Sequence, residues 1–67
     1  MEVLAGILHD TYTDENGEKI PYEEKVIGVI EDDTFKCTSI PDFMTFSMPK
    51  EQFFAKVTDI QTIWSKE

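Results

Sequence analysis

The sequence predicts a small α+β domain, an antiparallel meander of three or four strands followed by a C-terminal helix. Three features favour it: two apolar, β-prone blocks around an Asn-Gly pair, a further β-prone segment after a second turn, and a helical stripe near the C-terminus. A chain of 67 residues has room for one small domain, residues 1–67. The alternative is an all-β five-stranded small barrel, SH3-like or OB-like.

The first expected element is a long hairpin that joins residues 3–13 to residues 19–30. Asn16 and Gly17 tolerate the positive φ of a type I′ turn, and Asn-Gly between β-prone runs is a strong hairpin signal. Pairing outward from this dipeptide aligns the two apolar blocks. The expected partners are Ile7 with Val26, Ala5 with Gly28, Val3 with Ile30 and, less favourably, Asp10 with Glu23.

Away from its tip, this hairpin is apolar on both faces. Strands of that kind are normally covered on both sides, as in a small barrel, a sandwich or a dimer. Pro21 cannot donate a ladder hydrogen bond, so it predicts a bulge or an edge near the tip. Gly6 and Gly28 indicate strand bends or close packing.

The rest of the chain divides at two further turns. Residues 31–33 form an acidic turn, residues 34–40 a third strand and residues 43–47 a short fourth strand. Four apolar side chains in and beside the fourth strand are expected in the core: Phe43, Met44, Phe46 and Met48.

The last segment is predicted as a continuous helix. Ser47 suits an N-cap, Pro49 suits a first helical turn, and apolar side chains recur at helical spacing. That stripe consists of Phe53, Val57, Ile60 and Trp64. The β-branched residues after position 57 favour a different solution, a short helix over 49–56 and a final strand over 57–64.

Charge narrows the choice of partner. Fourteen acidic residues face six lysines and no arginine, for a formal net charge of −8. Nucleic-acid binding needs a basic surface, so direct binding to nucleic acid is not expected, whereas a protein partner with a basic surface is. The 40% apolar content with eight aromatic residues still suffices for a packed core.

Chemistry-bearing residues are scarce. Cys37 and His9 are the only cysteine and histidine, so neither an intramolecular disulfide nor a Cys/His zinc cage can form within one chain. No nucleophile stands at a recognisable spacing from a base, and the isolated glycines make no phosphate loop. We therefore expect no enzyme, no metal and no cofactor. Without these stabilising devices, a homo-oligomer or docking on a larger protein becomes more favourable.

The expected compartment is the cytoplasm of a bacterial cell or of a phage-infected host. No apolar run reaches the 18 residues of a membrane span, and the start Met1-Glu2-Val3-Leu4 lacks the basic region of a secretory signal. A single thiol fits a reducing compartment. The absence of arginine fits the AT-rich codon usage of low-GC bacteria and their phages.

The function predicted from these features is that of a small acidic protein-binding module. One form of it is a phage-encoded inhibitor that mimics phosphate charge and occupies a basic groove of a host nucleic-acid enzyme or defence system. Two alternatives remain: a structural or accessory subunit of an oligomer, and a small-molecule-binding oligomer with its site between subunits. The expected partner-binding residues gather at the hairpin tip: Tyr12, Asp14, Glu15, Glu18, Tyr22, Glu23 and Glu24.

Overall fold

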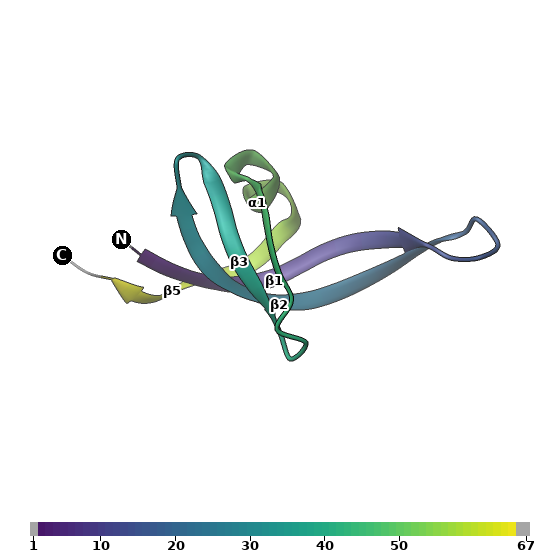
Figure 1. The fold of residues 1–67 in the computed structure, drawn as a ribbon, viewed down its shortest axis with the longest axis horizontal. Helices are drawn as coiled ribbons and strands as arrows, with labels where there is room; N and C mark the ends of the chain where they lie inside the picture. The colour runs from purple at the N-terminus through teal and green to yellow at the C-terminus, as the bar shows by residue number, and fades with distance from the viewer. Residues whose placement is uncertain (1, 66–67) are drawn as a thin grey trace.

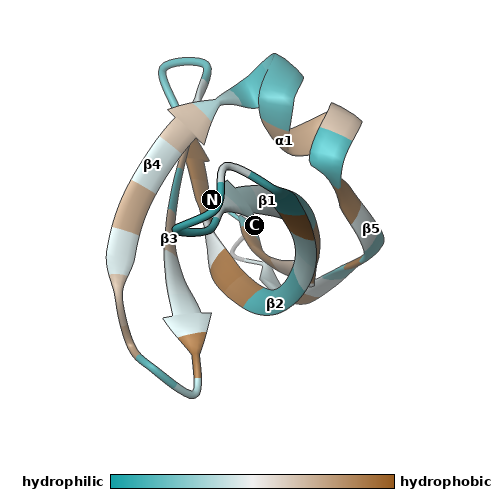
Figure 2. Cartoon of the chain, turned by 90° about the vertical axis from the view of Figure 1, so that its right-hand side faces the viewer, coloured by the Kyte–Doolittle hydropathy of each residue, from teal (hydrophilic) through white to brown (hydrophobic). Residues whose placement is uncertain are grey.

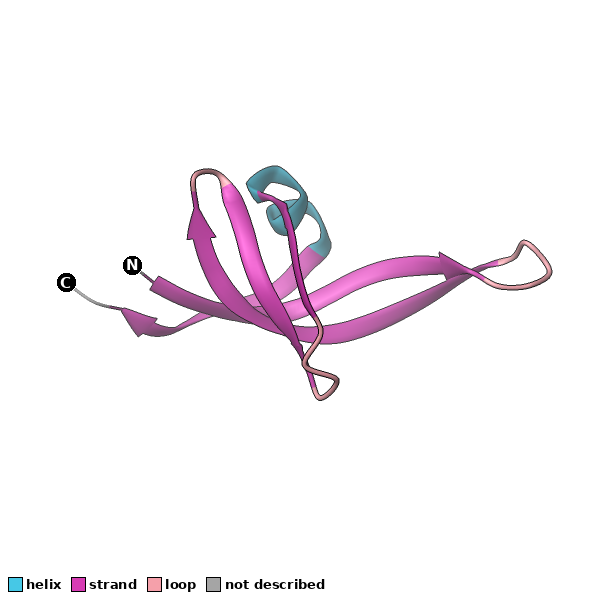
Figure 3. Ribbon diagram, viewed as in Figure 1, coloured by secondary structure: helices cyan, strands magenta, loops and turns pink. Residues whose placement is uncertain are grey.

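The computed structural model describes residues 2–65, which form one five-stranded antiparallel sheet and one short helix (Figure 1). The sheet order is β4-β3-β2-β1-β5. Most of the chain is strand (Figure 3), so the all-β five-stranded alternative fits better than a three- or four-stranded α+β meander. The elements are β1 (Glu2–Thr13), β2 (Lys19–Glu31), β3 (Thr34–Ile40), β4 (Thr45–Pro49), α1 (Lys50–Lys56) and β5 (Val57–Ser65).

The sheet is strongly curved and open. In Figure 2, which looks along the β1–β2 hairpin from its tip, β4 lies on one side, β5 on the other and α1 above. Among residues 2–65, β4 and β5 are the two edges of the sheet and do not pair with each other. The molecule measures 49 × 23 × 19 Å, and the long dimension runs along the hairpin.

The continuous C-terminal helix is wrong. Helix α1 ends at Lys56, and the chain continues as β5 along β1, as the alternative of a short helix and a final strand predicts. Pairing with β1 supplies hydrogen bonds to a segment rich in Thr and Ile, which are weak helix formers. Of the expected stripe, Phe53 and Val57 are buried, whereas Ile60 and Trp64 are exposed.

The predicted hairpin is correct, but its register is wrong by one residue. Val3 pairs with Val29 and Ala5 with Ile27, where the sequence predicted Ile30 and Gly28. The same shift places His9, rather than Asp10, opposite Glu23, and so removes the expected like-charge pair.

Turn chemistry explains the shift. Three residues, Glu15 to Gly17, connect Asp14 to Glu18, and only Gly17 has a positive φ, of 81°. This is a three-residue hairpin loop with glycine in the left-handed position, and it replaces the expected two-residue type I′ turn. Positive φ values at both central residues of a two-residue turn occur at Asp32 (50°) and Asp33 (62°), between β2 and β3.

The core lies between the concave side of the sheet and α1. Phe53 of α1 packs against Phe35 of β3, with ring centroids 4.1 Å apart. Both helix ends are tied to the sheet: Lys50 N donates to Asp33 O at 2.8 Å, and Lys56 Nζ lies 3.3 Å from Asp10 Oδ1. The buried apolar side chains are Leu8, Val26, Phe35, Cys37, Met48, Phe53 and Val57.

The β3–β4 turn corrects part of the predicted core. Met48 is buried and Phe46 packs partly against the core, but Phe43 and Met44 are 73% and 64% exposed. Strand β4 begins at Thr45, after the turn rather than at Phe43. Ser39 is fully buried beneath the turn, and its Oγ accepts a hydrogen bond from Met44 N at 3.2 Å. In this turn the side chains of Phe43 and Met44 project into solvent.

Candidate functional site

The β1–β2 hairpin extends beyond the rest of the sheet as a two-stranded ribbon (Figure 1). Strand β3 pairs with β2 only from Lys25 onward, and β5 pairs with β1 only as far as Leu8. We call residues 9–24 the acidic arm. Its outer strand edges are unpaired among residues 2–65, so the backbone groups along these edges are open to a partner.

The arm keeps a regular ladder up to its loop. Thr11 pairs with Pro21 without a register shift, so the bulge expected at Pro21 is absent and the edge alternative is correct. At the tip, Asp14 Oδ1 accepts hydrogen bonds from the backbone N–H groups of Asn16 and Glu18, both at 2.9 Å. The Asp14 carboxylate therefore shapes the loop, a role that the sequence prediction did not separate from partner binding.

The two tyrosines of the arm contact each other. Tyr12 and Tyr22 lie diagonally across the strands, with ring centroids 5.9 Å apart and planes tilted by 51°. Tyr12 is 52% exposed and Tyr22 is half-buried. They share the arm face that continues into the core, because Asp10, Tyr22 and Glu24 occupy the same side as buried Leu8 and Val26.

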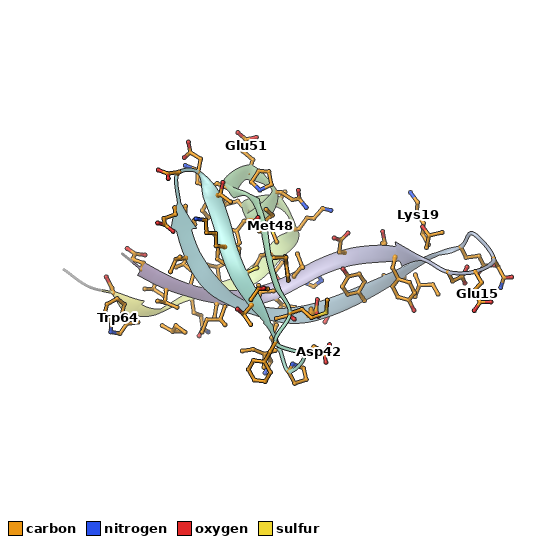
Figure 4. The ribbon with its side chains drawn as sticks, viewed as in Figure 1. Glu15, Lys19, Asp42, Met48, Glu51 and Trp64 are labelled. Atoms are coloured by element: carbon orange, nitrogen blue, oxygen red, sulfur yellow. The ribbon has the colours of Figure 1, made fainter. Side chains whose placement is uncertain are left out.

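The arm carries a dense negative charge. Six carboxylates and one lysine, Lys19, lie between residues 9 and 24, so the arm accounts for −5 of the formal charge of −8. Figure 4 shows Glu15 and Lys19 at the far end of the molecule. The predicted acidic turn at residues 31–33 lies at the opposite end of β2.

The predicted acids divide into three groups. Asp14, Glu15 and Glu18 lie in or beside the loop, and of these only Asp14 has a structural role in the turn. Glu23 projects from the face opposite the tyrosines, 3.4 Å from His9 Nδ1, with a side chain that is 69% exposed. Glu24 lies on the tyrosine face and is half-buried.

Two ionisable groups of the arm have shifted pKa values. Burial raises the pKa of Tyr22, and the neighbouring carboxylates of Asp10 and Glu24 raise it further. The backbone N–H of Thr11 and the ammonium of Lys56 lower the pKa of Asp10. Asp10 was not among the predicted partner-binding residues, and the ion pair shows that it attaches the arm to α1.

A groove that the sequence did not reveal lies where the arm joins the body. It has a volume of about 490 Å³ and is lined by the tyrosine face of the arm and by β3, β4 and α1. Its apolar wall is formed by Met44, Phe46 and Met48, and Glu24 lies on its acidic side. The groove could have been predicted from the β3–β4 turn. If Met44 is assigned to this turn and not to the core, its side chain is available to line a surface groove.

The only histidine and the only cysteine of the chain lie in different environments. His9 Nε2 lies 2.7 Å from Thr58 Oγ1, a threonine on the exposed edge strand, and Nδ1 faces Glu23. Cys37 is buried, and burial raises the pKa of its thiol to about 11. Within residues 2–65, no three His, Cys, Asp or Glu side chains are grouped so as to hold a metal ion.

Comparison with protein families, with curated proteins and with solved structures finds no match to this chain. Within the part of the chain that the structure describes, no helix has the length and apolar character needed to cross a membrane. Function is therefore inferred from the geometry of the arm.

Proposed function

We propose that the chain is a protein-binding module whose acidic arm inserts into a basic groove of its partner. The observation that carries the proposal is the projection of the arm: a two-stranded ribbon with six carboxylates and a tyrosine pair extends beyond the packed body. Charge complementarity of this kind steers association and raises on-rates. The module's own core needs few of these side chains, which leaves them for a partner.

The arm provides two types of contact. Glu15, Glu18 and Glu23 supply exposed negative charge around the tip and on one face. The exposed Tyr12 ring and the groove beside Tyr22 supply apolar contact on the other face. Aromatic side chains that become buried beside charged neighbours are typical centres of binding energy, with the surrounding charges governing the on-rate and salt dependence.

The kind of partner follows from the charge. A groove that binds nucleic acid is basic, and a narrow acidic ribbon competes for the same lysines and arginines. We therefore favour an inhibitor of a nucleic-acid enzyme or of a defence system, such as a phage would encode, over an adaptor that binds elsewhere. Competition by nucleic acid distinguishes the two, because only the inhibitor shares its site with the nucleic acid.

The test is a capture experiment with a matched pair of variants. In the arm variant, three acids without a role in the loop are neutralised: Glu15→Gln, Glu18→Gln and Glu23→Gln. In the control variant, three exposed acids away from the arm are neutralised: Glu2→Gln, Asp32→Asn and Glu51→Gln. Asp32 lies in the β2–β3 turn, at the end of β2 opposite the arm, and Glu51 lies on α1 (Figure 4). Both variants have the same net charge.

We expect the wild type and the control variant to retain proteins from a bacterial lysate at low salt. The arm variant should not retain these proteins. High salt should release them, and so should added double-stranded DNA or RNA if the partner is a nucleic-acid enzyme. Equal capture by the arm variant and the control variant would contradict the proposal. If added nucleic acid does not release the captured proteins, the chain is an adaptor and the inhibitor hypothesis is rejected.

A further inference from the structure

The convex side of the sheet, away from α1, carries an apolar surface that the arm proposal does not use. Leu8 and Val26 point to the α1 side and are buried, so the alternate residues of β1 and β2 point to the other side. In the strand pairing, these residues of β1 lie beside those of β2. Trp64 of β5 pairs with Val3 and extends the same surface to the edge strand. We call this the outer face: Val3, Ala5, Ile7, Ile27, Val29 and Trp64.

The described elements leave this face uncovered. The first five of its side chains are half-buried by their neighbours within the sheet, and Trp64 is 51% exposed. Figure 4 shows Trp64 projecting from β5 on the side of the sheet away from α1. A compact monomer of 7.8 kDa exposes about 4,400 Å², whereas this chain exposes 5008 Å².

The size of the uncovered surface suits a dimer. The chain exposes about 600 Å² more than a compact monomer of its mass, and each partner in a standard interface buries about 800 Å². Seven buried apolar side chains among residues 2–65 make a small core, and covering one apolar face with another is a common way for such domains to gain stability.

The charges at the border of the outer face make it self-complementary. Lys25 of β2 and Asp59 of β5 line the same shallow hollow beside Ile7 and Ile27. Among residues 2–65 neither of them forms an ion pair. Strand β1 lies between them, which separates their backbones by about 10 Å. A partner that presents an acid over Lys25 and a base over Asp59 would complement both charges.

We propose that a second copy of this chain covers the outer face, about a twofold axis parallel to the strands. Such an axis lays β5 of one copy over the β2–β3 side of the other. Lys25 of each copy then faces Asp59 of its partner, on both sides of a shared apolar layer. Because the axis runs along the strands, both acidic arms project from the same end of the dimer.

The charge of the chain determines how salt affects this dimer. Two copies with a formal charge of −8 each repel one another, and their arms lie at the same end. Salt screens that repulsion more than it weakens two Lys25–Asp59 pairs. The dimer therefore strengthens as salt rises, which is opposite to the response expected for binding of the arm to a basic partner.

Sedimentation equilibrium tests the proposal with two variants at exposed positions and two matched controls. Lys25→Glu places like charges together at the border, and Lys50→Glu makes the same charge change on α1, on the other side of the sheet. Trp64→Ala removes an aromatic ring from the outer face, and Phe43→Ala removes one from the β3–β4 turn, where the side chain is 73% exposed. Circular dichroism confirms that each variant is folded.

The expected mass rises with concentration from 7.8 kDa toward twice that value. Lys25→Glu and Trp64→Ala should each weaken the dimer by about tenfold or more, whereas both controls should stay within about twofold of the wild type. A wild-type mass of 7.8 kDa at every concentration would overturn the proposal. So would a dimer that Lys25→Glu and Trp64→Ala leave unchanged. Neither result depends on whether the arm binds a partner.

Discussion

Two glycines allow neighbouring strands to approach closely, as the sequence predicted. A Cβ atom on Gly28 would overlap the Lys36 carbonyl oxygen and lie 2.6 Å from the Cα of Cys37. One on Gly6 would lie 2.5 Å from Val57 Cγ1 and 2.9 Å from the Thr58 carbonyl oxygen. At Gly28 the obstacles are backbone atoms of β3, which cannot move without disturbing the β2–β3 ladder.

Gly28→Ala is therefore expected to lower the free energy of unfolding by about 3 kcal/mol, because the added methyl group forces two paired strands apart. Gly17→Ala is the comparison. Nothing lies within 4 Å of that position, but its φ is 81°, so a cost of about 1 kcal/mol is expected from backbone strain alone. Urea denaturation measures both. Equal costs for the two variants would contradict the close approach of β2 and β3.

Cys37 is predicted to be unreactive in the folded protein. Its side chain is 5% exposed, and burial, together with the nearby Glu24 carboxylate, raises the pKa of its thiol to about 11. The smaller thiolate fraction alone slows reaction with a disulfide reagent at pH 8 by about 100-fold, and burial slows it further. Reaction in urea at the rate of a free thiol, and a much slower reaction without urea, would confirm this prediction.

The same thiol gives the stability a pH dependence. Because its pKa is raised on folding, the unfolded chain loses the proton first as the pH rises. The contribution is complete below pH 9 and is lost between pH 9 and about 11, and it amounts to about 3 kcal/mol. Unfolding curves of the wild type and of Cys37→Ala, measured across this range, isolate the effect. If both lose stability equally, the thiol is not responsible.

At the scale of the elements, the turns determine the register. Asp32 and Asp33 both have positive φ values, the backbone of a two-residue type I′ hairpin turn, without the Asn-Gly pair that usually marks it. The Asn-Gly pair instead lies in a three-residue loop, where Asp14 binds two backbone N–H groups. The extra loop residue moves the β1–β2 pairing by one position.

Asp32 allows a direct test of this assignment. Asp32→Gly should be about 1 kcal/mol more stable than Asp32→Ala, because glycine accepts a φ of 50° without a Cβ clash. Asp42, which is exposed in the β3–β4 turn and is not among the residues with a positive φ, is the matched site. There the Ala variant should be at least as stable as the Gly variant. The same order at both sites would contradict a type I′ turn at Asp32.

The hairpin, the third strand and the position of the acidic tip were predictable because each depends on local patterns of β-prone and turn residues. The final strand was predicted only as the alternative. Its side chains fit a helical stripe as well as a strand, and pairing with the edge of β1, a contact between distant residues, decides between them. Register failed because it depends on loop length. The segment Asp14-Glu15-Asn16-Gly17 also fits a type I turn with Asp first and Gly last, whereas the Asn-Gly pair alone predicts the shorter turn.

The candidate site was predictable in composition but not in shape. The seven residues do lie together on the arm, yet the sequence could not show that Glu23 faces away from the tyrosines or that Asp14 supports the loop. The groove was missed because Met44 was assigned to the core. Its exposure depends on the turn that buried Ser39 holds from inside.

At the scale of the molecule, charge and apolar surface are separated. The arm carries six of the fourteen acids, the outer face is apolar, and the core lies on the opposite side of the sheet. The two proposals assign these surfaces to different partners with opposite salt responses. An acidic arm that binds a basic groove weakens as salt rises, and a dimer between negatively charged copies strengthens.

The affinity of the captured partner as a function of salt tests the central proposal most directly. Calorimetric titration of the purified partner with the wild type, the arm variant and the control variant gives three affinities at each salt concentration. We expect the arm variant to bind at least about tenfold more weakly and with a shallower dependence on salt, while the control variant follows the wild type. An arm variant that binds like the wild type at every salt concentration would show that the acidic arm is not the binding surface.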